Sequence, residues 1–240
     1  MVWESMDKVL KYLEANQPRF IEDLCSYLRF PSVSAQPQHA ADINACADWL
    51  VTHCRSIGLE AELHATSGCP VVMARNFRAR TRGRPHYLIY GHYDVQPAEP
   101  FELWKTPPFE PRLQGRSLFA RGSTDNKGQN FAHLKAIEAY LKTGTEMPCD
   151  LTVVLEGEEE IGSASLAPFL KEHRKKLLCD AIVISDTGMP DKKHPALTYS
   201  LRGVLAIEVK LWGHHAICIR VSMAVPWTIR RWFSASCWPS

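Results

Sequence analysis

Acidic side chains and one histidine stand directly after the apolar runs of this sequence, where strands are expected to end. In open α/β sheets, ligands bind in the crevice beyond the carboxyl ends of the strands. A further aspartate stands just before a helical pattern, in the segment ARGSTDNKG. The residues that this arrangement singles out as candidates for chemistry are His92, Asp94, Asp125, Glu159, Glu160 and Asp186.

Five of these side chains are carboxylates, and in one cleft their charges would repel one another. Burying about five negative charges costs a large free energy unless cations neutralise them. One histidine with several carboxylates suits zinc (Zn2+), with Mn2+ or Co2+ as substitutes. A carboxylate that bridges two ions ~3.5–4 Å apart is typical of aminopeptidases and related hydrolases. The residue types therefore predict a two-metal centre.

Each of these motifs has a plainer interpretation when it is taken alone. An acidic run such as EGEEEIGS is often a solvated turn or a helix N-terminus, and a single aspartate such as Asp186 often caps a turn. The combination of all motifs at strand and helix edges favours a metal centre. Competing signatures are absent, because the sequence contains no HExxH, GxSxG, P-loop or GxGxxG motif.

Apolar strands alternate with helical patterns along most of the chain. This alternation predicts an α/β fold with a mostly parallel sheet covered by helices. Residue spacing predicts helices over 5–16, 18–29, 39–57, 127–142 and 164–178, and strands over 60–65, 70–75, 86–91, 151–157 and 181–185. The proline-rich stretch 95–117 is expected to form a functional loop or lid. Residues 197–213 alternate like a strand of a separate, smaller sheet.

The composition is that of an ordinary globular protein. The chain has 240 residues, 45% of them hydrophobic, which is enough for one full core and part of a second domain. A formal net charge of +2 without a basic run excludes nucleic acid as an expected partner. No signal peptide or membrane-spanning window is recognised, so we expect no membrane partner and a cytoplasmic location.

Five motifs together resemble those of a known family. They are FPSVSA (30–35), YGHYDVQPA (90–98), ARGSTDNKGQ (120–129), EGEEEIGS (156–163) and VISDT (183–187). In order and spacing they are similar to the zinc metallopeptidase family of carnosinase-like dipeptidases, aminoacylase, glutamate carboxypeptidase and succinyl-diaminopimelate desuccinylase. The resemblance extends from about residue 5 to residue 213. It implies the zinc-peptidase-like catalytic fold, of which this chain carries the first half, followed by the first strand of an α+β lid domain.

The resemblance implies a set of zinc ligands. His92 and Asp186 would bind one zinc ion, and Glu160 would bind the second. Asp125 would bridge both ions, and the peptide bond from Asp125 to Asn126 would be cis.

The resemblance also implies two residues that act beside the metals. Asp94 would orient His92, and Glu159 would serve as the general base that takes a proton from the attacking water. The choice of Glu159 and Glu160 depends on the family's pattern, in which the pair precedes a small-residue turn. A slip of one residue, which would bring in Glu158, is the alternative.

The implied activity is that of a zinc-dependent hydrolase of amide bonds, acting on a small peptide or an N-acyl amino acid. The motif YGHYDVQP with Trp104 downstream looks most similar to the dipeptidase branch. An N-acyl-amino-acid deacylase is the alternative within the family. Outside it, a non-catalytic metal-binding fragment or pseudo-enzyme and a metal-dependent phosphohydrolase stay open.

The family pattern divides the chain into three expected regions. Residues 1–197 would be the N-terminal part of the catalytic domain, 198–213 the start of a lid and dimerisation domain, and 214–240 an aberrant tail. The family's last zinc-ligand histidine lies beyond the matched motifs. We therefore expect a weak second zinc site, weak or no activity, and no homodimer of the kind expected for the complete family protein.

The segment 214–240 differs in composition from the rest of the chain. It holds three tryptophans and three arginines but no lysine, aspartate or glutamate, and no helix or strand period persists through it. Back-translation of His214 to Val221, read in another frame, can give Pro-Cys-Asp-Leu-His-Ser-Gly, which is similar to the family's lid motif. We hypothesise that this segment is a frameshifted reading of the gene, and the coding DNA tests this hypothesis.

Overall fold

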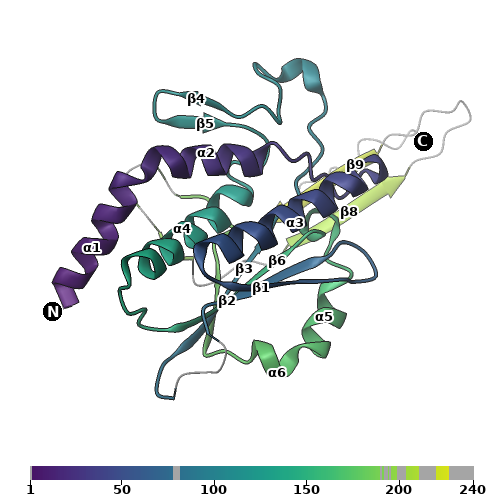
Figure 1. Ribbon diagram of the computed structural model, residues 1–240. Coiled ribbons are helices and arrows are strands. Elements are labelled where there is room, and N and C mark those ends of the chain that lie inside the picture. Colours follow the sequence, from purple (N-terminus) through teal and green to yellow (C-terminus); the bar gives the residue numbers. More distant parts are fainter. Residues whose placement is uncertain are drawn as a thin grey trace, which may run out of the picture. The chain divides into compact units, whose positions relative to one another are not determined.

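The computed structural model describes residues 2–77, 82–189, 191, 194, 196–198, 204–210 and 220–226. The chain divides into two compact units, residues 1–186 and residues 187–240. Figure 1 shows the helices and strands of both units.

A five-stranded mixed sheet forms the centre of the first unit, with the strand order β1-β2-β6-β3-β7. Three neighbouring strands are parallel, namely β6 (Asp150–Glu156), β3 (His86–His92) and β7 (Ala181–Ile184). The hairpin of β1 (Glu60–His64) and β2 (Val71–Arg75) joins the free side of β6 in antiparallel orientation. The predicted α/β fold is confirmed, with parallel strands in the part of the sheet that carries the candidate residues.

Helices cover both faces of this sheet (Figure 1). The helices of this unit are α1 (Val2–Ala15), α2 (Gln17–Leu28), α3 (Ala40–Ile57), α4 (Lys127–Thr143), α5 (Leu166–Glu172) and α6 (Arg174–Leu177). Of these, α1 packs against α4 and α2. One core cluster joins residues of α2, α3 and α4 to alternate strand positions such as Val72 and Val153. The intervening positions, such as Val71 and Val154, pack with Phe169 of α5 on the opposite face. The period-2 alternation of a strand therefore distributes the apolar side chains between two cores.

Most predicted elements of the first unit are observed. Glycines end two helices as expected, because Gly58 after α3 and Gly144 after α4 adopt positive φ values of 109° and 64°. The single helix predicted over 164–178 is wrong, since the chain forms two short helices that meet at His173. The stretch 95–117 is also not free of regular structure, because it contains a short 3₁₀ helix, η2, and most of a small hairpin. These elements are η2 (Phe101–Leu103), β4 (Arg112–Gln114) and β5 (Ser117–Phe119).

The second unit contains a separate two-stranded sheet. Strand β8 (Val204–Lys210) pairs in antiparallel orientation with β9 (Arg220–Pro226). The predicted strand of a separate, smaller sheet is thus observed over 204–210. Its partner strand lies within 214–240, the segment through which no helix or strand period persists. Residues 220–226 alternate valine and methionine with other types, a pattern typical of a strand but too short to stand out in this tail. The two boundaries between the three expected regions, and the frameshift, stay predictions.

No helix in the described ranges is long and apolar enough to cross a lipid bilayer.

A buried ammonium connects α4 to two other helices of the first unit. Lys135 of α4 is only 5% exposed. Its Nζ lies 2.8 Å from Asp23 Oδ2 of α2, 2.9 Å from Glu138 Oε2 and 3.0 Å from His53 Nε2 of α3. Because an ammonium can only donate, the His53 Nε2 atom must accept and therefore carries no proton. Burial and the nearby charge of Lys135 lower the pKa of His53 to about 4.

We expect acidification from pH 6.5 to pH 4 to weaken the folded state through His53. The folded-state pKa lies below the ordinary value of 6.5, so the unfolded chain takes up the proton first. Stability is therefore present above pH 6.5 and is lost as the pH falls toward 4. An NMR titration of His53, with urea unfolding of the parent and of His53→Gln at pH 7 and pH 5, measures this. The parent should lose more stability than the variant, and a folded-state pKa near 6.5 would contradict the prediction.

Candidate metal centre

His92 stands at the carboxyl end of β3, and its imidazole is completely buried. Its Nε2 atom has no hydrogen-bond partner among the described residues. Three carboxylate oxygens surround this nitrogen and come from three other segments of the chain. Their distances from His92 Nε2 are 3.2 Å for Asp125 Oδ1, 3.4 Å for Asp186 Oδ2 and 3.9 Å for Glu159 Oε2. A buried ring nitrogen that makes no hydrogen bond but faces several carboxylates is suited to binding a metal ion.

Two groups of side chains could each hold a metal ion. The first is His92 with Glu159 and Asp186, and the second is His92 with Asp125 and Glu160. Within each group the ligand atoms lie within 4.8 Å of one another. The structure thus brings together all the residues that the sequence suggested as metal ligands. The first group also contains Glu159, the expected general base.

Strand register explains why these residues meet. In the β3–β6 pair, His92 lies opposite Glu156, so both strands end at the same level. The β3–β7 pair places Tyr90 opposite Ile184, so the segment before Asp186 ends close to the same edge. Parallel strands therefore deliver their following residues to one side of the sheet.

Asp94 is completely buried and contacts two parts of the cluster. Its Oδ1 atom lies 3.3 Å from His92 Nδ1 and accepts a hydrogen bond from the backbone N–H of Glu159 at 3.2 Å. Its Oδ2 atom accepts the backbone N–H of Glu160 at 3.1 Å. The His92 ring is fixed mainly by Nδ1, which donates to the backbone oxygen of Asp94 at 3.0 Å, while the Asp94 carboxylate holds the turn that presents the two glutamates.

The three consecutive glutamates have different surroundings. Glu158 is buried, and its carboxylate accepts hydrogen bonds from Cys69 N at 2.7 Å and from Ser165 N at 2.9 Å. Glu159 and Glu160 are partly exposed and face the cluster, where the Gln96 amide donates to Glu160 at 2.6 Å. The alternative in which Glu158 takes one of the two roles at the metal centre is therefore disfavoured, because its carboxylate oxygens already accept the hydrogen bonds that hold the turn.

Another buried carboxylate holds the far end of this turn. Glu156 accepts hydrogen bonds from the hydroxyls of Ser163, at 2.8 Å, and of Tyr90. Burial raises the pKa of Glu156. Gly162, with φ 94°, reverses the chain directly after Ile161. The motif EGEEEIGS thus uses its first two glutamates for structure and presents the next two to the cluster.

Asp125 precedes α4, and the Asp125–Asn126 peptide bond is cis, as the family resemblance implied. The Asn126 side chain joins two other parts of the site. Its Oδ1 accepts the backbone N–H of His92 at 3.3 Å, and its Nδ2 donates to Ser185 O at 2.9 Å. Sequence reasoning assigned Asn126 no role, because nothing in its own segment shows which strand ends it will contact.

His133 was also missed by the sequence reasoning. It lies on α4, and its Nε2 is 2.7 Å from the hydroxyl oxygen of Ser185, next to Asp186. Burial lowers the pKa of His133. Asn126 is the N-cap of α4 and His133 follows seven residues later, about two turns along the same side of the helix.

The cluster attracts cations. Burial lowers the pKa of His92, but its hydrogen bond to Asp94 and the charges of Asp94, Asp186 and Glu159 outweigh this and raise the pKa to about 9. Burial, together with the carboxylate of Asp186, raises the pKa of Glu159. Burial also raises the pKa of Glu160. Crowded carboxylates thus favour positive charge at their centre, which protons or metal ions can supply.

Gly91 allows α4 to approach β3 next to His92. A Cβ atom at this position would lie 2.7 Å from Asn126 Oδ1 and 3.0 Å from Asn130 Cβ. We expect Gly91→Ala to lower the free energy of unfolding by about 1–3 kcal/mol, because overpacking forces the helix away from the strand. Urea unfolding measures the loss. Gly188→Ala is the control, because among the described residues no atom beyond its chain neighbours lies within 4 Å of the added Cβ, and an equal effect of both changes would contradict the prediction.

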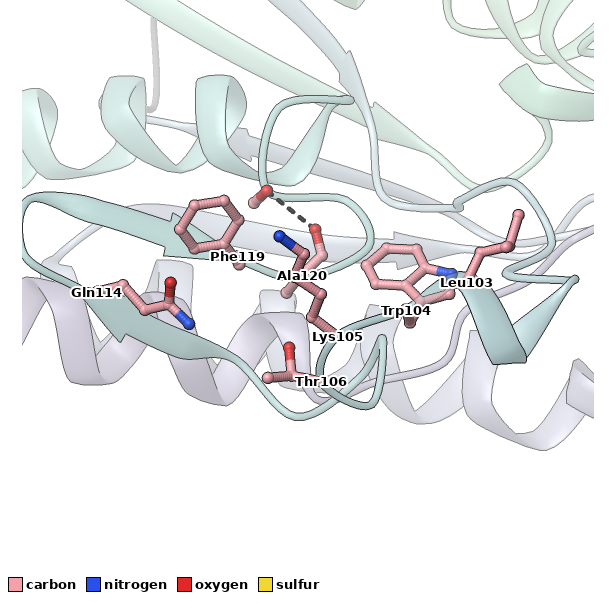
Figure 2. Close-up of a pocket in the computed structure, with 8 residues that line it drawn as sticks. Leu103, Trp104, Lys105, Thr106, Gln114, Phe119 and Ala120 are labelled. Atoms are coloured by element: carbon pink, nitrogen blue, oxygen red, sulfur yellow. Dashed lines mark hydrogen bonds between the residues drawn. The ribbon is translucent and has the colours of Figure 1, made fainter.

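A recess of about 460 Å³ lies in the segment between Asp94 and Asp125. Figure 2 shows its lining, which includes the rings of Trp104 and Phe119 and the side chain of Lys105. The indole of Trp104 donates to Ala98 O at 2.8 Å, which anchors the loop. None of the six candidate residues lines this recess.

Fold and site define an α/β protein with a candidate metal centre of one histidine and several carboxylates at the sheet edge. Residues 88–231 match peptidase family M20/M25/M40, and the chain belongs to this family. The match continues beyond residue 214.

Curated relatives include dipeptidases. The chain is 31% identical over 225 residues to the Cys-Gly metallodipeptidase dug1 of Schizosaccharomyces pombe, covering 88% of this chain and 47% of the relative. It is 29% identical to the human Beta-Ala-His dipeptidase, covering 85% of this chain and 43% of that protein. This chain therefore spans less than half the length of these relatives.

Solved structures support the same fold. The di-peptidase Dug1p from Saccharomyces cerevisiae aligns with a TM-score of 0.75 and 28% identity, covering 82% of this chain and 44% of that one. Human carnosine dipeptidase 1 aligns with a TM-score of 0.71 and 25% identity, covering 83% of this chain and 43% of that one.

Proposed function

We propose that this chain supplies the metal centre of a zinc-dependent dipeptidase. The proposal is carried by the buried His92 Nε2 atom, which makes no hydrogen bond within the described part of the chain. This atom faces carboxylates from separate segments of the chain. The names of the relatives, a Cys-Gly metallodipeptidase and a Beta-Ala-His dipeptidase, favour small peptides as substrates.

The proposed ligands are taken from the two groups of side chains, with Glu159 kept as the base and Asp125 as the bridge that the family resemblance implies. His92 and Asp186 would hold one zinc ion, Glu160 would hold the other, and Asp125 would be shared. Zinc, when bound, would lower the pKa of a water molecule and polarise the scissile carbonyl.

Glu159 is proposed to move the proton. Its carboxylate would take a proton from the attacking water and then give it to the nitrogen of the leaving amine. Burial and neighbouring carboxylates raise the pKa of Glu159, which makes it a stronger base than an exposed glutamate. Asp94 would hold the backbone of this residue in place through its hydrogen bond to Glu159 N.

A metal-binding protein without turnover is the second candidate. In the described part of the chain, His92 is the only imidazole in either group of candidate ligands. An ion held by Asp125 and Glu160 would then have to share the His92 imidazole with the other ion, or be bound by carboxylates alone. Zinc ordinarily takes about four ligands, of which three or four are protein side chains, so the second ion should bind weakly.

Zinc content and peptide hydrolysis of the 240-residue chain distinguish these candidates. The metal-free protein is titrated with zinc, bound zinc is counted by mass spectrometry, and release of amino acids from Cys-Gly and β-Ala-His is followed. N-acetyl-methionine tests the deacylase alternative. Zinc-dependent cleavage of a dipeptide supports the proposal. Bound zinc without any cleavage supports the second candidate, and absence of bound zinc contradicts both.

A further inference from the structure

The segment 30–35, between α2 and the following short helix, lies against the metal centre. Its sequence motif FPSVSA has no metal-ligating or proton-transferring group. The hydroxyl of Ser32 donates to Tyr93 O at 2.6 Å. The buried ammonium of Lys127 donates to Phe30 O at 2.8 Å. These bonds fix the segment both to the chain that carries Asp94 and to the start of α4.

Ser34 hydrogen-bonds through its side chain to a residue of the cluster. Its hydroxyl donates to Asp94 Oδ2 at 2.6 Å. Asp94 is completely buried, and its two oxygens also contact His92 Nδ1 and the backbone N–H groups of Glu159 and Glu160. A short hydrogen bond to a buried carboxylate is charge-assisted and stronger than a neutral one.

We propose that Ser34 is a positioning residue of the metal centre. Its hydroxyl restrains rotation of the Asp94 carboxylate, which contacts His92 Nδ1 at 3.3 Å and accepts the backbone N–H groups of Glu159 and Glu160. Loss of the hydroxyl therefore disturbs ligands of both groups at once. The inference rests on the proposed function only in that the centre binds a metal ion.

Three substitutions test the role of the hydroxyl. Ser34→Ala removes it, Ser34→Thr keeps it, and Ser34→Cys keeps the size of the side chain but replaces the hydroxyl by a weak donor. Ser26→Ala is the matched control, because the Ser26 hydroxyl donates to Glu22 O on the exposed side of α2.

Zinc affinity of each full-length variant is measured by competition with a chromophoric chelator, and urea unfolding is measured on the metal-free proteins. Removing an outer partner of a metal ligand costs about 10–100-fold in metal affinity, so we expect about 10-fold weaker zinc binding for Ser34→Ala. Ser34→Thr should bind as the parent does, and Ser34→Cys should lie between them. Ser26→Ala should leave zinc affinity unchanged.

A purely structural role gives a different result. If Ser34→Ala unfolds more easily but binds zinc as tightly as the parent, the proposal is overturned. If Ser34→Ala does not fold, parent-like zinc affinity of Ser34→Cys overturns it. A parent protein that binds zinc without hydrolysing peptides contradicts the proposed function and leaves this test intact, whereas a parent that binds no zinc overturns both.

Discussion

Glu159→Gln lowers the rate of dipeptide hydrolysis by a factor of about 10²–10⁴, the usual contribution of a general base, and leaves bound zinc nearly unchanged. Glutamine keeps the size of the side chain but cannot take a proton from water. The Glu159 carboxylate lies beside the cluster, with Oε2 3.9 Å from His92 Nε2, and is partly exposed to solvent. These features suit a group that exchanges protons with the attacking water.

Zinc content decides between the two roles that the geometry allows for Glu159. The residue could also be a ligand with His92 and Asp186. Loss of zinc from Glu159→Gln would contradict the assignment as general base. Glu160→Gln provides the matched comparison, since it should lose zinc from the second group. Glu172→Gln, an exposed residue at the end of α5, should change neither zinc content nor turnover.

His92→Ala abolishes tight zinc binding, because His92 is a proposed ligand of the first ion and the only imidazole in either group of described residues, which leaves carboxylates alone for the second ion. The loss of zinc affinity should exceed the roughly 10–100-fold reduction in metal affinity that follows removal of a residue hydrogen-bonded to a ligand. Zinc stoichiometry at micromolar free metal measures the effect, and hydrolysis of Cys-Gly should disappear in parallel.

His39→Ala is the control for the histidine change. His39 pairs with Asp42 at 2.7 Å near the start of α3 and belongs to neither group of candidate ligands. It should bind zinc as the parent does. Retention of one tightly bound zinc ion by His92→Ala would contradict the ligand assignment, because the carboxylates alone would then be sufficient.

The sequence by itself determined the fold class and the residues of the cluster. Apolar runs that alternate with helical patterns predict parallel strands, and the ends of such strands share one edge of the sheet. Residues that directly follow those runs, such as His92 and Asp186, had to meet there. Periodicity and strand ends are local properties, so a single sequence can show them.

Only the tertiary structure decided which of three adjacent glutamates face the cluster. The carboxylate of Glu158 is held away from the cluster by hydrogen bonds from the backbone N–H groups of Cys69 and Ser165, which lie 89 and 7 residues away in the sequence. The contact of Ser34 with Asp94 spans 60 residues, and that of His133 with Ser185 spans 52. Hydrogen bonds between distant segments depend on how the elements pack, and packing leaves no periodic trace in the residues that take part.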